Sequence, residues 1–318
     1  MRPLRAFQAF VTLQAVVTLC LLGGAMLVPG EAAANNYDRL GHGRLLTNDL
    51  LGDGHDRWRT GSAAASFVWS REWQGRAPDR PGQLLELRLN AEIIAPENLR
   101  RPVPGDRPLA NALSLGLHTH FNIEATEIAL GGDLVATGSQ TALTDVQRTI
   151  HNVVDGTDPS LQVRRAQIGD DLFPTAVAEA GQEYRLGGPV RLRPFVEGRF
   201  GAETLLRLGA DMVIGSLGEG GLMVRDPVTG QRYRTIAGDG RGLSFVLGAD
   251  IAHVEDSEFL PKSRGYRLTD ARTRVRAGAH WQADGGTELF YGLTWLDKEF
   301  KAQREGQFVG SVRLGIKF

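Results

Sequence analysis

The sequence predicts an all-β protein that crosses a membrane as an antiparallel, up-and-down β-barrel of about twelve strands. Three observations support this prediction: an export signal at the start of the chain, apolar residues at every second position in many short segments, and a final segment that ends on an aromatic residue. Strands of about 9–11 residues that alternate lipid-facing apolar and lumen-facing polar side chains are typical of membrane barrels.

The first 34 residues have the layout of a cleaved secretory signal peptide. Two arginines precede an apolar run from about Phe10 to Val28, and the small residues Ala32–Ala34 follow. A transmembrane anchor is the alternative, because the run approaches the ~20 residues that span a bilayer. The Pro-Gly break and the alanine triplet favour cleavage, so we expect residues 35–318 to form the mature barrel domain.

Cysteine count and charge add little to this picture. The only cysteine, Cys20, lies inside the apolar run and would be removed with it, so the mature chain would contain no disulfide. The formal net charge of the whole chain is −1. This balance gives no indication of nucleic-acid binding.

The alternation is clearest in the segment LLELRLNAEII, residues 84–94. One face of this segment is apolar, and the other face carries Glu86, Arg88, Asn90 and Glu92. A soluble β-sandwich would also alternate, but its polar face would point to solvent. Arginine and glutamate on one face suit a closed lumen in which the charges neutralise each other. Closure also removes sheet edges, which lipid does not tolerate.

The last segment, GSVRLGIKF, alternates with a period of two and therefore predicts a strand. A final strand that ends in an aromatic residue, here Phe318, resembles the assembly signal of bacterial outer-membrane barrels. An edge strand of a soluble domain is the alternative. Together with the export signal, this strand predicts a barrel in the outer membrane of a Gram-negative bacterium. We expect a monomer, because a self-contained barrel needs no partner.

The alternation stops between about residues 135 and 180. This segment predicts a long extracellular loop that contains an amphipathic helix, with Ser139 as its N-cap. Apolar residues at helical spacing are Leu143, Val146, Ile150 and Val153, and the opposite face carries Thr144, Gln147, Arg148 and His151. Loops of this length are usually functional or disordered, and the apolar stripe favours a functional loop.

Two groups of polar residues could carry chemistry. The stretch LLTNDLLGDGHDRWRTGS, residues 45–62, is either a solvated acidic loop or part of a metal site. His118 and His120 could form a metal pair, but packing inside the lumen is the favoured interpretation. The sequence contains no G-x-S-x-G elbow, so it gives no support for a serine hydrolase of that type.

Five blocks of the sequence occur in the order found in one known family. They are Asn48-Asp49, DRWRTG at 56–61, GDRPLA at 105–110, DVQRTIH followed by DGTDP at 145–159, and the closing KEFKAQREGQFVGSVRLGIKF. With these blocks the chain resembles the outer-membrane lipid A 3′-O-deacylases. The resemblance implies a twelve-stranded barrel with a calcium-dependent ester hydrolase site between the barrel wall and a loop helix. The substrate would be lipid A of lipopolysaccharide, which would lose its 3′-linked acyl or acyloxyacyl chain.

The resemblance assigns catalysis to His151, which would take a proton from the attacking water. An imidazole with a pKa near ~6.5 can act as a general base at neutral pH. A loop histidine bonded to its neighbours is the alternative. Thr60 matches a threonine that would orient water or substrate, and a lumen-facing structural threonine is its alternative.

The resemblance also implies a calcium site. Asn48 and Asp49 match the family's metal pair, and Ca²⁺ prefers such hard oxygen ligands. Asp158 falls one residue later than the family's acidic ligand and is expected to be a further ligand. Asp53 and Asp56 are interpreted as turn residues.

Two positions depart from the family pattern. Leu99 stands where the family has a lysine, so neighbouring Arg100 and Arg101 are expected to bind the substrate, as arginine binds phosphate well. Leu161 stands where the family has a tryptophan. These departures leave two alternatives open: a non-enzymatic barrel that serves as a channel or scaffold, and another lipid acyl hydrolase such as a phospholipase.

Overall fold

The computed structural model describes residues 37–154 and 156–315. The predicted signal peptide and the terminal aromatic residue lie outside the described residues. No helix within the described ranges is long and apolar enough to cross a membrane.

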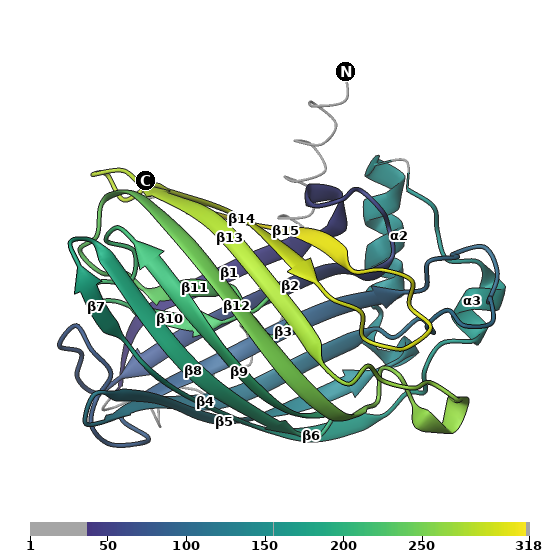
Figure 1. Ribbon diagram of the computed structural model, residues 1–318, viewed down its shortest axis with the longest axis horizontal. Helices are drawn as coiled ribbons and strands as arrows, with labels where there is room; N and C mark the ends of the chain where they lie inside the picture. The colour runs from purple at the N-terminus through teal and green to yellow at the C-terminus, as the bar shows by residue number, and fades with distance from the viewer. Residues whose placement is uncertain (1–36, 155, 316–318) are drawn as a thin grey trace.

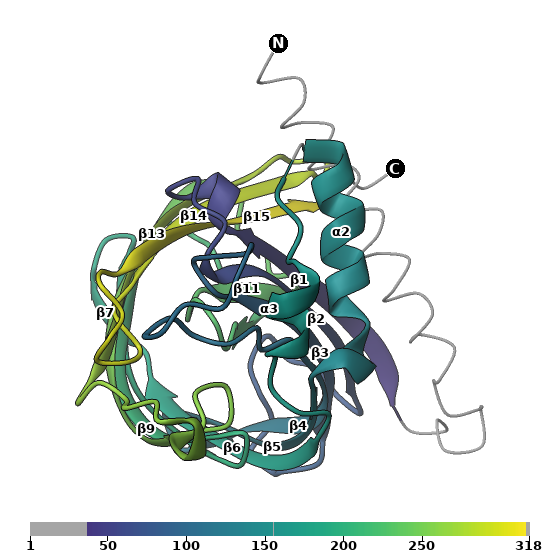
Figure 2. The ribbon, with the colours of Figure 1, turned by 90° about the vertical axis from the view of Figure 1, so that its right-hand side faces the viewer.

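Twelve antiparallel strands close into a barrel, as the sequence predicts (Figures 1 and 2). The first strand pairs with the last, with Thr47 opposite Ser311, and the remaining gap is closed by pairing of the sixth and seventh wall strands, β6 and β8. The wall strands are β1 (Asp38–Asn48), β2 (Trp58–Ser70), β3 (Leu84–Ala95), β4 (Ala112–Ile123), β5 (Thr126–Thr137), β6 (Leu172–Gln182), β8 (Val190–Phe200), β9 (Glu203–Ile214), β12 (Gly242–Ser257), β13 (Arg272–Gln282), β14 (Glu288–Leu296) and β15 (Gln307–Gly315).

The two faces of the wall differ as the alternation predicts. On β4 the outward leucines Leu113, Leu115 and Leu117 are exposed, whereas the inward His118 and His120 are buried. An exposed apolar belt around a polar interior is the arrangement that a bilayer requires. His118 Nε2 lies 2.8 Å from the Asp133 carboxylate and His120 Nε2 lies 2.7 Å from that of Glu86. The two histidines therefore pack in the lumen with separate carboxylate partners.

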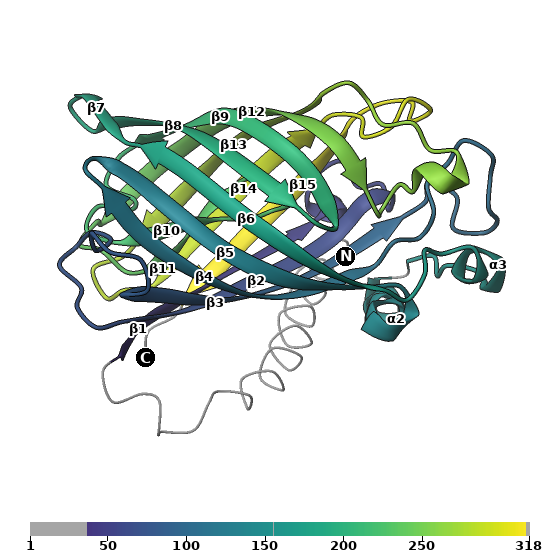
Figure 3. The same ribbon diagram turned by 90° about the horizontal axis from the view of Figure 1, so that it is seen from below.

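The segment between β5 and β6 carries the helices (Figure 3). It covers residues 138–171, because both strands extend further than the expected limits of 135 and 180. The segment contains the 3₁₀ turn η3 (Ser139–Thr141), the helix α2 (Leu143–Val154) and the short helix α3 (Leu161–Arg165). We call the barrel end that bears α2 and α3 the helical rim, and the other end the opposite rim.

The predicted N-cap of this helix is wrong. Ser139 lies in η3 and donates from its hydroxyl to Asp170 at 2.7 Å. Ala142, with a φ of 55°, then turns the chain through a left-handed conformation before α2 begins. The serine therefore holds the start of the loop to its end and does not cap α2.

The remaining strands lie at or inside the opposite rim. β7 (Tyr184–Gly187) extends the edge beside β8. β10 (Leu222–Arg225) and β11 (Arg232–Ile236) form a separate hairpin, and Figure 2 shows β11 inside the ring of wall strands. The 3₁₀ turns η2 (Asp49–Leu51) and η4 (Lys262–Arg264) belong to loops at the helical rim.

Candidate active site

The candidate site begins where β1 ends at the helical rim. The Asn48 side chain accepts a hydrogen bond from the backbone of Leu50 at 2.8 Å and so caps the turn η2. This turn buries Asp49, of which only 1% is exposed although it lies in a loop. Leu50 points outward and is 53% exposed.

The carboxyl group of Asp49 has no cationic side chain as a hydrogen-bond or ion-pair partner among the described residues. Its Oδ2 accepts the backbone N–H of Arg57 at 3.1 Å. Burial raises the pKa of Asp49 to about 8, and the nearby Asp56 carboxylate contributes in the same direction. A negative charge at this position is therefore costly unless a cation accompanies it.

Asp56 lies at the site and is not only a turn residue, so that interpretation is wrong. Its Oδ1 accepts a hydrogen bond from the Thr60 hydroxyl at 2.5 Å. Its Oδ2 lies 3.2 Å from His151 Nε2, but it is a buried oxygen without a partner in hydrogen-bond geometry. Asp53, in contrast, has the expected turn role, since its carboxylate accepts the backbone N–H groups of His55 and Phe308.

The helix α2 brings His151 to this acidic pair from a distant part of the sequence. Figure 2 shows α2 beside the wall near β1, β2 and β3. His151 is 8% exposed, and its Nδ1 lies 3.1 Å from Asp158 Oδ1. Burial lowers the pKa of His151, but the Asp56 and Asp158 carboxylates outweigh burial and raise it overall. The imidazole is thus held between two carboxylates, one at each ring nitrogen.

The segment after α2 closes over this imidazole. A Cβ atom at Gly156 would lie 2.7 Å from the His151 ring, so only glycine lets the chain pass so near. The segment is then fixed by Ser160, whose N–H donates to the carbonyl of Leu99 at 2.8 Å and whose hydroxyl caps α3. Asp158 is consequently placed on the imidazole and does not line the cavity beside Asp49.

Gln147 is a site residue that the sequence reasoning missed. It lies one helical turn before His151, is 3% exposed, and neither its Nε2 nor its Oε1 has a hydrogen-bond partner. A buried amide with two unpaired polar atoms is rare in folded proteins and calls for an explanation. The signal was the i, i+4 spacing to the histidine, which places both side chains on one helix face.

These groups line a cavity of about 520 Å³ between the outside of the wall and α2. We call it the rim cavity. Its lining includes Asn48, Asp49, Thr60, Arg100, Gln147 and His151. Thr60 therefore faces the cavity, and the lumen-facing alternative for this residue is wrong. The structure brings together most of the residues that the sequence singled out, whereas Arg101 is exposed and does not line the cavity.

The structure shows the contacts of the residues that depart from the family pattern. Leu99 is buried with Ala95, Leu109 and Val163, so it packs α3 against the loop after β3. Arg100 and Arg101 are exposed, and both their backbone N–H groups donate to the Asn98 side chain, at 3.0 and 3.1 Å. Leu161 is 52% exposed.

The acidic pair fits a divalent cation. In the ranges 37–154 and 156–315, no group of three or more His, Cys, Asp or Glu side chains gathers closely enough to form a metal site by itself. Asp49 and Asp56 nevertheless offer two poorly compensated carboxylates, and the Asn48 amide oxygen is adjacent. Ca²⁺ completes such partial sets with backbone carbonyls and waters.

Comparisons with known proteins bear on the family and the fold of the chain. The family model described as "Outer membrane protein LpxR" matches residues 17–318. No curated protein matches the chain. Among solved structures, LpxR from Salmonella typhimurium matches with a TM-score of 0.70 and 17% identity, over 86% of this chain and 98% of that one. The β-domain of the Bordetella autotransporter BrkA matches with a TM-score of 0.40 and 12% identity, over 88% of this chain and 99% of that one.

Proposed function

Because the chain belongs to the LpxR family of outer-membrane proteins, we propose that it is a calcium-dependent lipid A 3′-O-deacylase. The family and the barrel fold place the chain in the Gram-negative outer membrane. Long loops of such barrels face the cell exterior, so the helical rim is the extracellular one. Lipid A lies in the outer leaflet, next to the rim cavity.

The observation that carries this proposal is the meeting of His151 with Asp49 and Asp56 on the outer side of the wall. The three side chains come from α2 and from the β1–β2 loop, and they meet where a lipid headgroup would lie. A base beside a cation site suits hydrolysis of an ester by an activated water.

In the proposed reaction His151 accepts a proton from water, and the water oxygen bonds to the ester carbonyl carbon. The ester bond then breaks, the acyl chain leaves as a carboxylic acid, and the proton passes to the sugar oxygen. Asp158 holds Nδ1, so Nε2 is the atom that exchanges the proton. We therefore assign Asp158 an orienting role in place of the expected metal-ligand role.

The proposed calcium ion would be held by Asp49, Asp56 and the Asn48 amide oxygen. When bound, it would polarise the ester carbonyl and stabilise the charge that develops on its oxygen. Thr60 holds the Asp56 carboxylate in place through its hydroxyl. Arg100, at the mouth of the rim cavity, would bind a phosphate of the substrate.

The alternatives differ in what they explain. A non-enzymatic barrel would give no reason for the unpaired Asp56 oxygen and the unpaired Gln147 amide buried at the rim cavity, which lower stability. A phospholipase would use the same groups on another lipid. The two enzymes would share this site, so only the lipid that is hydrolysed distinguishes the phospholipase from the deacylase.

Mass spectrometry of lipid A tests the proposal. The chain is expressed in a Gram-negative host without a lipid A deacylase, alongside His151→Ala and the control His253→Ala, whose side chain is 69% exposed on the outer wall. We expect loss of a 3′-acyl or acyloxyacyl mass with the wild type and the control, and intact lipid A with His151→Ala. Unchanged lipid A with a folded wild-type barrel would refute the proposal, and loss of phospholipid chains would favour the phospholipase.

A further inference from the structure

The segment between β9 and β12, residues 215–241, folds into the lumen from the opposite rim. It carries the β10–β11 hairpin, which Figure 1 shows between the walls. The strands that it connects are neighbours, with Ile214 opposite Phe245, so a short turn would be enough to join them. The long inward segment therefore needs its own explanation. We call it the plug.

Hydrogen bonds define the shape of the plug at its inner end. Asp226 accepts hydrogen bonds from the backbone and the hydroxyl of Thr229, at 2.7 and 2.6 Å, and its own N–H donates to the carbonyl of Gln231. From the wall, Arg274 donates to the carbonyls of Pro227 and Val228 at 2.8 and 3.0 Å. The hairpin turn is thus shaped by its own side chains and held by β13.

One side of the plug packs against the wall through apolar side chains. Its buried residues Leu222, Val224, Tyr233 and Ile236 form one cluster with Leu45, Ala64, Val68, Leu84 and Phe290 of the wall. β11 approaches β1 so closely that a Cβ atom at Gly43 would lie 2.6 Å from the carbonyl oxygen of Arg234. The plug can therefore pack this closely against β1 only because residue 43 is a glycine.

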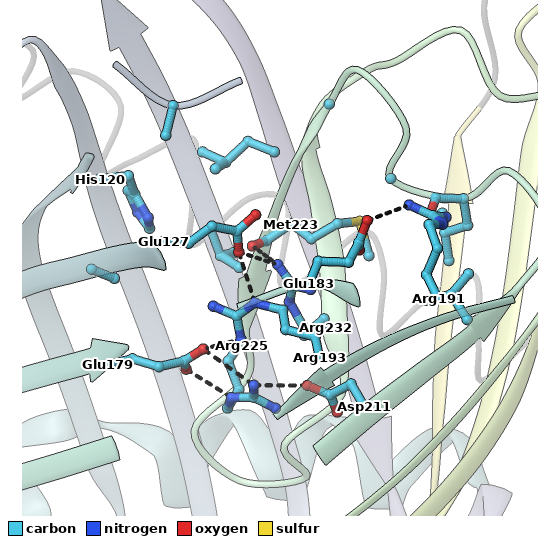
Figure 4. Close-up of a pocket in the computed structure, with 18 of the residues that line it drawn as sticks. His120, Glu127, Glu179, Glu183, Arg191, Arg193, Asp211, Met223, Arg225 and Arg232 are labelled. Carbon is cyan, nitrogen blue, oxygen red and sulfur yellow. Dashed lines mark hydrogen bonds and ion pairs between the residues drawn. The ribbon is translucent and has the colours of Figure 1, made fainter. Parts of the chain in front are cut away.

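The other side of the plug is held by ion pairs between its arginines and carboxylates of the wall (Figure 4). Arg225 donates to Glu179 and to Asp211, each at 2.8 Å, and its guanidinium lies 3.5 Å from the centre of the Phe195 ring. Arg232 pairs with Glu127 at 3.5 Å.

A third arginine connects the plug to β13 and β14. Arg234 donates to Glu288 on β14 and to Gln282 on β13. These wall carboxylates are buried or half-buried, and a buried charge that loses its partner is strongly destabilising. The three arginines of the plug therefore lock it to strands on several sides of the lumen.

Two cavities adjoin the plug inside the lumen. A cavity of about 240 Å³ lies between the plug and the wall, and a further cavity of about 70 Å³ lies beyond its tip. The guanidinium and carboxylate groups that line both cavities are mostly paired with one another. No ligand chemistry is needed to explain them.

We propose that residues 215–241 are a lumen plug that closes this barrel to ions and solutes, with Arg225, Arg232 and Arg234 as its locks. The plug is separate from the rim cavity and does not depend on the proposed hydrolase activity. The barrel is then an outer-membrane scaffold that carries a site on its outer wall without leaking through its centre.

Conductance of the purified, folded full chain in planar lipid bilayers tests the plug. We expect no current steps with the wild type. The variant R225E/R232E/R234E places like charges opposite the wall carboxylates and is expected to show discrete steps. Replacement of residues 218–239 by a short Gly-Ser turn is expected to give larger steps. The matched control R241E changes an exposed arginine of the same segment, whose guanidinium donates to the carbonyls of residues 239 and 240, and should stay silent.

A second approach changes the wall and leaves the plug intact. Gly43→Leu is expected to displace β11 and produce current steps, whereas Gly198→Leu, where no atom lies within 4 Å of the added Cβ, should not. This pair keeps the proposal testable if the triple variant fails to fold. Steady conductance of the wild type, or silence of a folded barrel without the plug, would overturn the proposal.

Discussion

The rim cavity and the plugged lumen are both rich in buried charge, but they satisfy it differently. In the lumen, Glu179 and Asp211 each accept hydrogen bonds from the plug's arginines. At the rim cavity, Asp49 has no cationic partner among the described residues, and Asp56 Oδ2 and Gln147 lack hydrogen bonds. Some guanidinium N–H groups of the lumen, such as Arg234 Nε, also lack a partner, but these two lumen carboxylates are paired with a cation. Paired charges hold a structure in place, whereas buried carboxyl and amide groups without partners reduce stability and persist where function requires them.

The two regions also differ in how they are assembled. Wall strands supply the lumen carboxylates, and their positions are set by the sheet register. The rim cavity combines a wall with a helix from a loop, joined through His151. The first region is therefore expected to lose stability when a charge is removed, and the second to gain stability.

The largest expected effect is on the response to calcium. Asp49→Asn should abolish both lipid A hydrolysis and the rise in melting temperature that calcium produces in the wild type, because it removes a ligand. In chelator the same variant should melt above the wild type, because a desolvated carboxyl is gone. Thermal unfolding with and without calcium measures both. Asp145→Asn, with a 76% exposed side chain, is the control; a normal calcium shift in Asp49→Asn would contradict the assigned ligand.

The next effect concerns a network of paired charges at the mouth of the lumen. Glu299 accepts from Arg59 Nε at 2.6 Å and from Arg107 Nη1 at 3.0 Å. Glu299→Gln should destabilise the barrel by about 3–5 kcal/mol, since it removes the carboxylate that pairs with the buried Arg107 guanidinium, whereas Arg59 keeps Glu92. The matched control is Glu255→Gln, whose side chain is 70% exposed.

The loss caused by Glu299→Gln should depend on pH. Burial would raise the pKa of Glu299, but Arg59, Arg107 and Arg272 hold it well below the ordinary value of 4.5. A lowered pKa stabilises the folded state above pH 4.5, and this contribution is lost as the pH falls towards the lowered value. Denaturant unfolding should therefore show a full difference at neutral pH and a smaller one in acid. A difference that grows in acid would contradict the network.

A smaller effect is expected at Gln147, where replacement should change activity and stability in opposite directions. Gln147→Leu should lower the turnover of lipid A by roughly tenfold to a hundredfold, less than loss of an oxyanion-hole donor. The same change should raise stability by about 1 kcal/mol or more, because two buried polar atoms without partners disappear. Turnover and unfolding are measured on the same preparation, with exposed Gln162→Leu as the control. A variant that is less stable and fully active would show that the amide is structural.

The smallest effect is expected at the exposed arginines. Arg100→Ala should raise the KM for lipid A a few-fold, most clearly at low salt, because an exposed arginine–phosphate contact is screened. Arg101→Ala should change the KM less, because Arg101 does not line the rim cavity. Arg185→Ala, 69% exposed at the opposite rim, serves as the control. Equal effects of all three changes would argue against a phosphate contact at Arg100.

The wall could be predicted from the sequence because alternation is a local property of each strand. The residues 84–94 show their two faces without knowledge of any partner. His151, Asn48 and Asp49 could be assigned because they lie in blocks that resemble a family. The structure places all three at the rim cavity.

The plug and Asp56 could not be predicted, for physical reasons. β10 has four residues and β11 has five, too few for a period to be visible, and the plug's arginines find their carboxylates on strands far away in the sequence. Asp56 stands beside turn residues, and its contact with His151 exists only after α2 has folded over the rim. Ser139 shows the converse error. Serine is a favourable residue type for a helix N-cap, but in the structure its hydroxyl donates a hydrogen bond to Asp170.

Release of the 3′-linked acyl chain from lipid A by the purified barrel tests the central claim most directly. The wild type, His151→Ala and R225E/R232E/R234E are compared at equal amounts of folded protein, with calcium present. We expect release by the wild type and by the plug variant, and a loss of about 10²–10⁴-fold in His151→Ala, the contribution of a general base. Undiminished release by His151→Ala would contradict the central claim.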